Sequence, residues 1–255
     1  MLEVRSLTKR YSSVPALQDV SFTVQPGEVL GYLGPNGSGK STTVKIITGL
    51  MEPSSGGVFF NGRNIREDLT AYKRLVGYVP EEANLYPFLS GLEYLELVGR
   101  LRGLPEKRIA RRADAMLEVF AMKPHRYTAI STYSKGMRQR ILLIAALLHN
   151  PELIIFDEPL SGLDVTSALI FRKLLEALSH EGKTIFYCSH VLEVVEKVCS
   201  HVIILQRGKQ LAYGSVEDLK RFQAMPSLEA AFSHLVQEQD AQASAQAIVE
   251  AVVRQ

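Results

Sequence analysis

The residue types with the clearest chemistry lie in one short stretch that follows the apolar run Val29 to Leu33. Backbone N–H groups can closely approach the oxygens of a polyphosphate only where side chains are missing, and glycines supply such positions. The spacing G-x-x-x-x-G-K-S, between an expected strand and an expected helix, predicts a phosphate-binding loop. Its residues are Gly34, Pro35, Asn36, Gly37, Ser38, Gly39, Lys40, Ser41 and Thr42.

Two side chains at the end of this loop are suited to contact a bound nucleotide and its metal ion. Lys40 is placed to reach the β and γ phosphates of a nucleotide, and the Ser41 hydroxyl can bind Mg²⁺. The helix that begins near Lys40 adds free N-terminal amides and the positive end of its dipole. A glycine-rich turn that binds nothing is the alternative, and the flanking strand and helix argue against it. The loop therefore predicts nucleotide binding.

Two carboxylates follow a second apolar run, Leu153 to Phe156. The run does not alternate, which is typical of a strand covered on both faces. Asp157 and Glu158 would then lie at the carboxyl end of a parallel strand, where α/β folds place ligand chemistry. Asp157 is predicted to hold Mg²⁺ opposite Ser41, and Glu158 to accept a proton from the attacking water. For Glu158 the alternative is a surface carboxylate at a strand end.

Three further side chains each allow two interpretations. His190 follows the expected strand Thr184 to Cys188, where it would either approach the γ-phosphate or serve as a structural histidine. Tyr11 precedes an expected strand and either packs against the core or stacks on a purine base. Cys188, close to His190, suggests a thiol nucleophile, but the apolar strand around it predicts inert packing.

Composition limits the classes of partner. The 255 residues, 46% of them hydrophobic, suffice for a well-buried core in one large or two small domains. Net charge is +2, from 29 basic and 27 acidic residues, so no nucleic-acid partner is expected. The two cysteines build no disulfide framework, which suits a reducing cytosol. No apolar run approaches the roughly 18 residues of a membrane span, and residues 1–10 do not resemble a signal peptide.

The order of expected elements predicts three regions. An α/β pattern over residues 1–84 resumes over 150–214, and together these form the nucleotide-binding core. Residues 85–149 are predicted to be a helical insert, because Ser90 and Glu93 form a capping-box pattern and further helical patterns follow. Residues 215–255 are predicted to be a helical tail, with one helix through Ser227 to Phe232 and another over 240–255.

The motifs resemble those of the nucleotide-binding subunits of ATP-binding cassette (ABC) transporters, over Met1 to Gly214. The resemblance implies a P-loop NTPase fold: an α/β, RecA-like parallel sheet core with N-terminal antiparallel strands, an inserted all-helical subdomain and a helical C-terminal tail. It also implies ATP hydrolysis with Mg²⁺ in a head-to-tail dimer, formed with a second copy or with a homologous ATPase subunit. The motifs, in order, are the phosphate loop, Tyr133–Arg140, Leu153–Pro159, Ser161–Asp164 and Ser189–His190.

The resemblance also implies roles for individual residues. Tyr11 resembles the aromatic residue that stacks on adenine. Ser134 and Gly136 match the family's signature sequence, which opens a helix aimed at the γ-phosphate held by the other subunit. Asp164 resembles the residue that connects the two sites across the dimer, and His190 resembles the residue that contacts the γ-phosphate.

Two departures from the family pattern point to one branch. Glu81 stands where the family usually has glutamine, which keeps an oxygen for the metal or the lytic water and adds a negative charge. The signature reads Tyr-Ser-Lys-Gly-Met rather than Leu-Ser-Gly-Gly-Gln. With the motifs Tyr86 to Ser90 and Ser227 to Phe232, both resemble the bacterial branch that serves ABC-2 type export permeases. This implies an integral membrane permease that docks near Glu81 to Leu101, and a peripheral location on the cytoplasmic face of the membrane.

Two other functions stay open at this point. A soluble ABC ATPase that acts on ribosomes or DNA would share the motifs, although its types usually carry two cassettes or a long coiled coil, and neither is seen here. A regulatory module that binds ATP without turnover would also share the loop. The presence of both Lys40 and Glu158 argues against the second.

Overall fold

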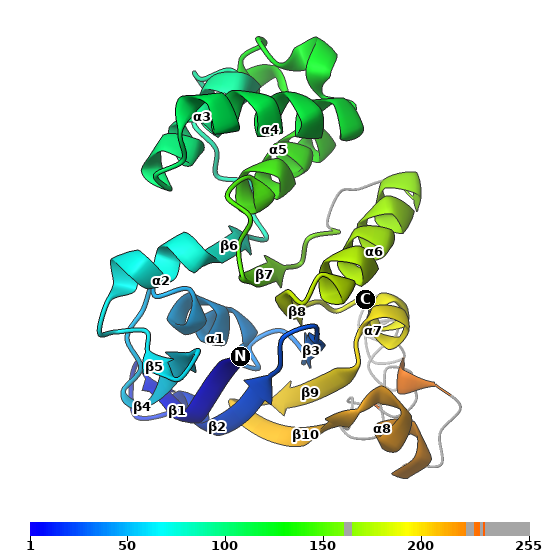
Figure 1. Ribbon diagram of the computed structural model, residues 1–255. Helices are drawn as coiled ribbons and strands as arrows, with labels where there is room; N and C mark the ends of the chain where they lie inside the picture. The colour runs from blue at the N-terminus through cyan, green and yellow to red at the C-terminus, as the bar shows by residue number, and fades with distance from the viewer. Residues whose placement is uncertain (161–164, 223–226, 230–231, 233–255) are drawn as a thin grey trace, which may run out of the picture.

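The structure, a computed structural model, describes residues 1–160, 165–222, 227–229 and 232. Two sheets form its lower part, and a lobe of helices lies beyond one edge of the second sheet (Figure 1). The first sheet is antiparallel with strand order β2-β1-β4-β5. Its strands are β1 (Leu2–Arg10), β2 (Pro15–Val24), β4 (Ser55–Phe60) and β5 (Arg63–Asn64).

The apolar run Val58 to Phe60, followed by Asn61 and Gly62, predicts a hairpin, and the antiparallel pair β4–β5 confirms it. Asn61 and Gly62 have φ values of 49° and 79°. Two-residue hairpin turns of type I′ need positive φ at both central residues, and Asn-Gly meets this need with little strain. The hairpin places β4 between β1 and β5.

The second sheet has strand order β10-β9-β3-β8-β7-β6 and is parallel except for β10. The strands β3, β7 and β8 are buried along their whole length, which is why their sequences are apolar without alternation. Their carboxyl ends meet at one edge. The strands are β3 (Val29–Leu33), β6 (Val76–Val79), β7 (Leu153–Asp157), β8 (Thr184–Cys188), β9 (His201–Gln206) and β10 (Lys209–Ser215).

Helices fill the space between the sheets and cover the far face of the second. α1 (Lys40–Ile47) buries Val44 and Ile47 in one core with residues of both sheets. On the other face, α6 (Val165–His180) and α7 (Leu192–Val198) pack against the second sheet, and the rings of Phe171 and Phe156 lie 5.0 Å apart. The second sheet is therefore covered on both sides and holds its strand ends rigidly.

The helical lobe has its own apolar core, which contains Leu95, Leu117 and Ile144. The Ser90 capping box is confirmed, since Ser90 N donates to Glu93 Oε2 at 2.8 Å and Ser90 Oγ accepts from Glu93 N at 3.3 Å. The domain boundaries at 84 and 150 stay predictions. The lobe contains α3 (Gly91–Leu101), α4 (Glu106–Val119), α5 (Lys135–Leu147) and the 3₁₀ turns η1 (Lys123–His125) and η2 (Ile130–Thr132).

Two elements were missed from the sequence. The apolar run Leu75 to Val79 predicts a strand that begins at Leu75, but α2 (Leu69–Leu75) is a seven-residue helix capped by Asp68, so Leu75 ends a helix. β10 pairs with β9 after a turn at Arg207 and Gly208. After β10, α8 (Val216–Phe222) begins the tail.

Part of the predicted tail, including the helix over 240–255, lies outside the described residues. No helix among the residues described here is long and apolar enough to cross a membrane.

Candidate active site

The phosphate loop connects β3 to α1, and close packing explains the glycine at position 39. Gly39 has φ 111°, and a Cβ there would lie 2.6 Å from Leu17 Cδ2 and 2.7 Å from the Ala16 carbonyl oxygen. The loop is also tied to the turn after β9, because Gly208 N donates to the Ser38 carbonyl oxygen at 2.9 Å. These contacts fix the loop backbone against the first sheet.

Within the loop, the Lys40 side chain is held by hydrogen bonds, whereas the residues at the rim of the loop are exposed. Lys40 Nζ donates to the Gly34 carbonyl oxygen at 2.6 Å and to the Pro35 carbonyl oxygen at 3.2 Å. Ser41, in the first turn of α1, is exposed, and Thr42 is partly buried. The rim of the loop, Pro35, Asn36 and Gly37, is exposed as well. The loop therefore offers accessible backbone and one ammonium group held in place.

Asp157 ends β7 and is 6% exposed. Parallel register places it beside Cys188 at the end of β8, whose thiol donates a hydrogen bond to the carboxylate. Burial raises the pKa of Asp157 to about 6. The thiol bond and the Lys40 charge oppose this shift, while the charges of Glu81 and Glu158 add to it. Among the residues that the structure describes, three acidic groups thus lie close together, and Lys40 is the cation that offsets the charge of Asp157.

Glu158 and His190 are brought into contact by the neighbouring strands β7 and β8. Glu158 Oε2 lies 2.8 Å from His190 Nδ1, and Ser189 Oγ lies 3.4 Å from the same oxygen. Glu158 has φ 48°, an uncommon conformation for a side chain of this size, and its N–H donates to the Cys188 carbonyl oxygen at 2.9 Å. Backbone strain of this kind is concentrated at functional sites. Glu158 is 9% exposed, whereas the His190 side chain is 73% exposed.

Other predicted site residues lie on different elements. Glu81 is exposed just after β6 and lies close enough to influence Asp157. The Tyr11 ring is 60% exposed in the β1–β2 connection, and its hydroxyl donates to Met51 Sδ at 2.9 Å. An exposed ring at this position is free to stack on another aromatic group.

The predicted signature residues lie at the start of α5. Ser134 caps that helix, since its Oγ accepts from Met137 N at 3.2 Å, and Gly136 lies in the first turn. Within the described ranges no hydrogen bond or ion pair joins either residue to the phosphate loop. The sequence assigned them to the site of the other subunit, and that assignment stays a prediction. Asp164 lies outside the described residues.

Two side-chain contacts near the site were not foreseen. Gln139, 2% exposed in α5, donates from Nε2 to the Pro159 carbonyl oxygen at 3.2 Å and so ties the helical lobe to the chain after Glu158. A buried amide among the apolar residues of α5 was the available signal. Cys188 is buried as predicted, but its thiol also bonds Asp157, which the register of β7 and β8 alone reveals.

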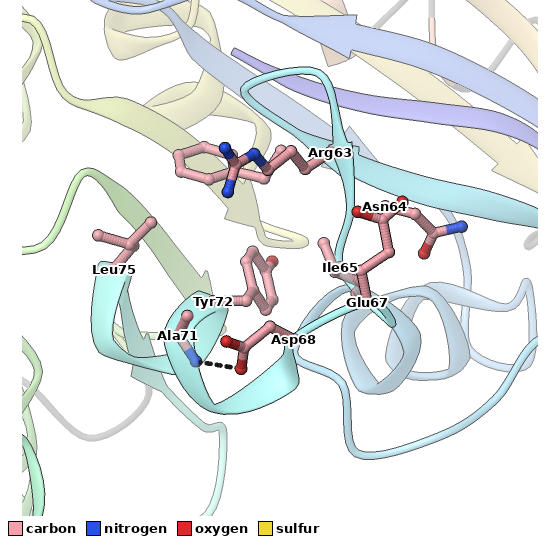
Figure 2. A pocket seen from close by; sticks show the side chains of 9 residues that line it. Arg63, Asn64, Ile65, Glu67, Asp68, Ala71, Tyr72 and Leu75 are labelled. Carbon is pink, nitrogen blue, oxygen red and sulfur yellow. Dashed lines mark hydrogen bonds between the residues drawn. The ribbon is translucent and has the colours of Figure 1, made fainter.

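A separate hollow lies between β5 and α2 (Figure 2). Figure 2 shows Arg63 and Asn64 on one side and Tyr72 and Leu75 on the other. None of its lining residues belongs to the predicted site.

Comparison with known proteins identifies the family. The model of the ABC transporter family matches residues 17–161, more than half of the chain, including the phosphate loop, Asp157 and Glu158. The chain belongs to the ABC transporter family. The assignment predicted from the motifs is confirmed, as is the P-loop NTPase fold with its antiparallel N-terminal sheet and parallel core sheet.

Curated relatives of this ABC protein cover most of its length. It is 36% identical to the ABC transporter ATP-binding protein NatA of Bacillus subtilis, over 86% of this chain and 91% of NatA. It is 37% identical to the linearmycin resistance ATP-binding protein LnrL of Bacillus subtilis, over 86% and 70% of the two chains. The Nod factor export ATP-binding protein I of Cupriavidus metallidurans is 34% identical over 86% and 72%.

Solved structures agree with this assignment. The structure of an ATP-binding subunit of an ABC transporter has a TM-score of 0.88 at 34% identity, over 92% of this chain and 99% of that one. A dimeric ATP-binding cassette in a post-hydrolysis state, bound to ADP and phosphate, has a TM-score of 0.78 at 27% identity, over 84% and 98%. The chain is thus the ATP-binding, ATP-hydrolysing subunit of an ABC transporter.

Proposed function

We propose that this ABC ATPase powers export by a separate ABC-2 type membrane permease, as a head-to-tail dimer on the cytoplasmic face of the membrane. The observation that carries the catalytic part is the contact between Glu158 and His190 beside the buried Asp157. The export part is supported by a relative whose name states Nod factor export and by another named for linearmycin resistance.

ATP binding would change the partners of Lys40. Its ammonium group now bonds two loop carbonyl oxygens, Gly34 and Pro35. Phosphate oxygens carry negative charge and form stronger, charge-assisted bonds, so they would replace these carbonyls as acceptors. The loop amides and the start of α1 would bind the remaining phosphate oxygens, and Tyr11 would stack on the adenine base.

The residues present fit Mg²⁺. The described residues contain no group of three or more His, Cys, Asp and Glu side chains that could hold a metal. Magnesium bound with a nucleotide needs only one or two protein ligands, because phosphates and waters supply the rest. Asp157 would be one ligand, as its buried charge is poorly offset, and the exposed Ser41 hydroxyl the other, with Glu81 nearby. When bound, the ion would neutralise charge on the β and γ phosphates.

Glu158 would act as the general base for the attacking water. Its Oε2 is already oriented by His190 Nδ1, and its burial protects the carboxylate from bulk solvent. A positioned base of this kind contributes about 10²–10⁴-fold to rate. The exposed His190 ring would contact the γ-phosphate and keep Glu158 aimed at the water. Ser134 and Gly136 of the second subunit would close the site.

The permease would dock on the face of the helical lobe near Glu81 to Leu101. Tyr86 and Phe88 are 62% and 93% exposed, and the ring centroids of Tyr86 and Tyr94 lie 6.3 Å apart. Neighbouring exposed aromatic rings are typical of a surface that another protein covers. Gln139 would relay movement of the lobe to the chain after Glu158, through its bond to Pro159.

A pull-down of the tagged full chain from detergent-solubilised membranes of its own organism tests this function, with ATP absent and present. A multi-span membrane protein in stoichiometric amount is the expected result. A Phe88→Asp variant should lose that protein, while Val119→Asp, on α4 and also exposed, should retain it. Recovery of ribosomal or DNA-repair proteins instead would favour the soluble ATPase.

A further inference from the structure

A short part of the tail, here called the C-terminal segment, lies next to the predicted ATP site. It consists of Ser227, Leu228, Glu229 and Phe232. Leu228 is fully buried, and Phe232 packs against the same apolar core. That core also contains Leu33, which precedes the phosphate loop, and Val195 of α7. The proposed mechanism assigns no task to this segment, although its motif is one of the features that point to the exporter branch.

Glu196 of α7 holds the segment in place. Its Oε1 pairs with Lys220 Nζ of α8 at 2.6 Å, and its Oε2 accepts from Leu228 N at 3.1 Å. Both charged side chains are partly buried, at 26% and 31% exposed. The Lys220 and Leu228 bonds hold the pKa of the Glu196 carboxyl below its usual value. One carboxylate therefore ties two successive parts of the tail to the same helix.

The segment forms a wall of a cavity at the catalytic loop. The cavity holds about 260 Å³ and lies where the phosphate loop faces the end of β8. Glu229 and Phe232 line it together with His190. Its other lining residues are Leu33, Gly34, Pro35, Ser189 and Leu192. The tail thus stands next to the histidine and the loop that the mechanism uses.

We propose that the C-terminal segment positions His190 for hydrolysis, and that Glu196 is the positioning residue that holds it there. α7 begins two residues after His190, and the Ser189 hydroxyl accepts from Val191 N at 3.1 Å. Any shift of α7 therefore moves the His190 backbone. Because the His190 side chain is mostly exposed, its direction depends on this backbone and on Glu158. The inference rests on the proposed role of His190.

The full chain with Glu196→Ala tests the proposal, and Glu193→Ala is the matched control. Both glutamates lie on α7, but Glu193 is exposed and pairs with Lys197 on the same helix. Misplaced catalytic groups lose rate rather than affinity, so Glu196→Ala should lower kcat about tenfold and leave KM for ATP unchanged. Glu193→Ala should keep both constants. Glu196→Gln, which can still accept from Leu228 N, should recover most of kcat.

A double-mutant cycle with His190→Ala separates positioning from general stability. If the segment acts through His190, Glu196→Ala causes no further loss of kcat in the His190→Ala chain. If the two substitutions reduced kcat independently, so that their effects multiplied, the inference would be overturned. A Glu196→Ala chain that unfolds at a lower temperature but hydrolyses ATP at the normal rate would also overturn it. Should Glu196→Ala fail to fold, Phe232→Ala at the cavity wall replaces it, with the same expected loss and the same contrary result.

The kinetics of the two single variants distinguish the proposed role of His190 from that of the C-terminal segment. Wild-type turnover by His190→Ala alone would remove His190 from the proposed mechanism. Impaired His190→Ala with normal Glu196→Ala would leave that mechanism standing and overturn only the positioning role of the C-terminal segment.

Discussion

Glu158 Oε2 lies 2.8 Å from His190 Nδ1, and this contact joins the ends of two adjacent parallel strands. The carboxylate is buried and the imidazole is exposed, and the contact between them orients one oxygen of the buried carboxylate. The left-handed backbone of Glu158 is held by its N–H bond to the Cys188 carbonyl oxygen of the neighbouring strand. The Glu158 carboxylate, which we propose as the general base, is therefore held in place by contacts within the chain itself.

Replacing Lys40 should weaken nucleotide binding itself. Hydrogen bonds to charged groups are worth about 1.5–3 kcal/mol, so Lys40→Ala should raise the dissociation constant for ATP about 10- to 100-fold. Titration calorimetry measures this directly. Lys45→Ala, on the same helix but exposed near its other end, is the control and should bind as the wild type does. Tight ATP binding by Lys40→Ala would mean that the phosphate loop is wrongly assigned.

Asp157 should make the stability of the nucleotide-free chain depend on pH. Its pKa is about 6 in the folded chain and 3.8 as an ordinary carboxyl, so the folded state binds its proton more tightly. Folding is therefore penalised as pH rises from about 4 to 6, and the penalty at pH 7.5 is about 3 kcal/mol. Asp157→Asn removes that charge.

Urea unfolding at two pH values checks the sign of this effect. Asp157→Asn should be more stable than the wild type by about 3 kcal/mol at pH 7.5 and by about half as much at pH 5. Equal stability at both values would show that the buried charge is already compensated. With ATP and Mg²⁺ added, the wild type should gain stability and Asp157→Asn should gain less.

Gly77 in β6 tests how tightly α5 packs on the second sheet. A Cβ there would overlap the Ala146 carbonyl oxygen and lie 2.9 Å from Pro151 Cγ. Gly77→Ala should therefore cost about 1–3 kcal/mol of unfolding free energy. Gly214→Ala in β10 is the control, because the nearest atom to its Cβ, Leu219 Cγ, is 3.9 Å away. Matching denaturation midpoints for the two variants would contradict the packing.

Local sequence could predict those parts of the site where a continuous apolar run is followed directly by residues that favour a turn. β3 and β8 have the expected bounds, and β7 extends one residue beyond them to Asp157, because continuous apolar runs end in glycine, carboxylate or serine residues. The Ser90 capping box is likewise local, since both of its bonds join residues three apart. The ends of these strands and the start of this helix are therefore determined by residues that are close together in the sequence.

The missed features depend on contacts between distant parts of the chain. The local sequence of β10 suggests a loop, and the strand is recognised only from its pairing with β9. The Tyr213 hydroxyl of β10 donates to the Thr23 carbonyl oxygen in the first sheet. The bond from Leu228 N to Glu196 also joins segments that no periodicity connects. The Cys188–Asp157 bond required the strand order. Sequence patterns specify elements, whereas these bonds come from how the elements pack.

The rate of ATP hydrolysis by the Glu158→Gln chain is the sharpest test of whether Glu158 acts as the general base. Steady-state ATP hydrolysis and ATP affinity are measured for this variant and for Glu181→Gln, an exposed control just after α6. The account predicts that Glu158→Gln binds ATP as the wild type does but hydrolyses it about 10²-fold more slowly or worse, as expected for loss of a general base. Unchanged turnover by Glu158→Gln would contradict it.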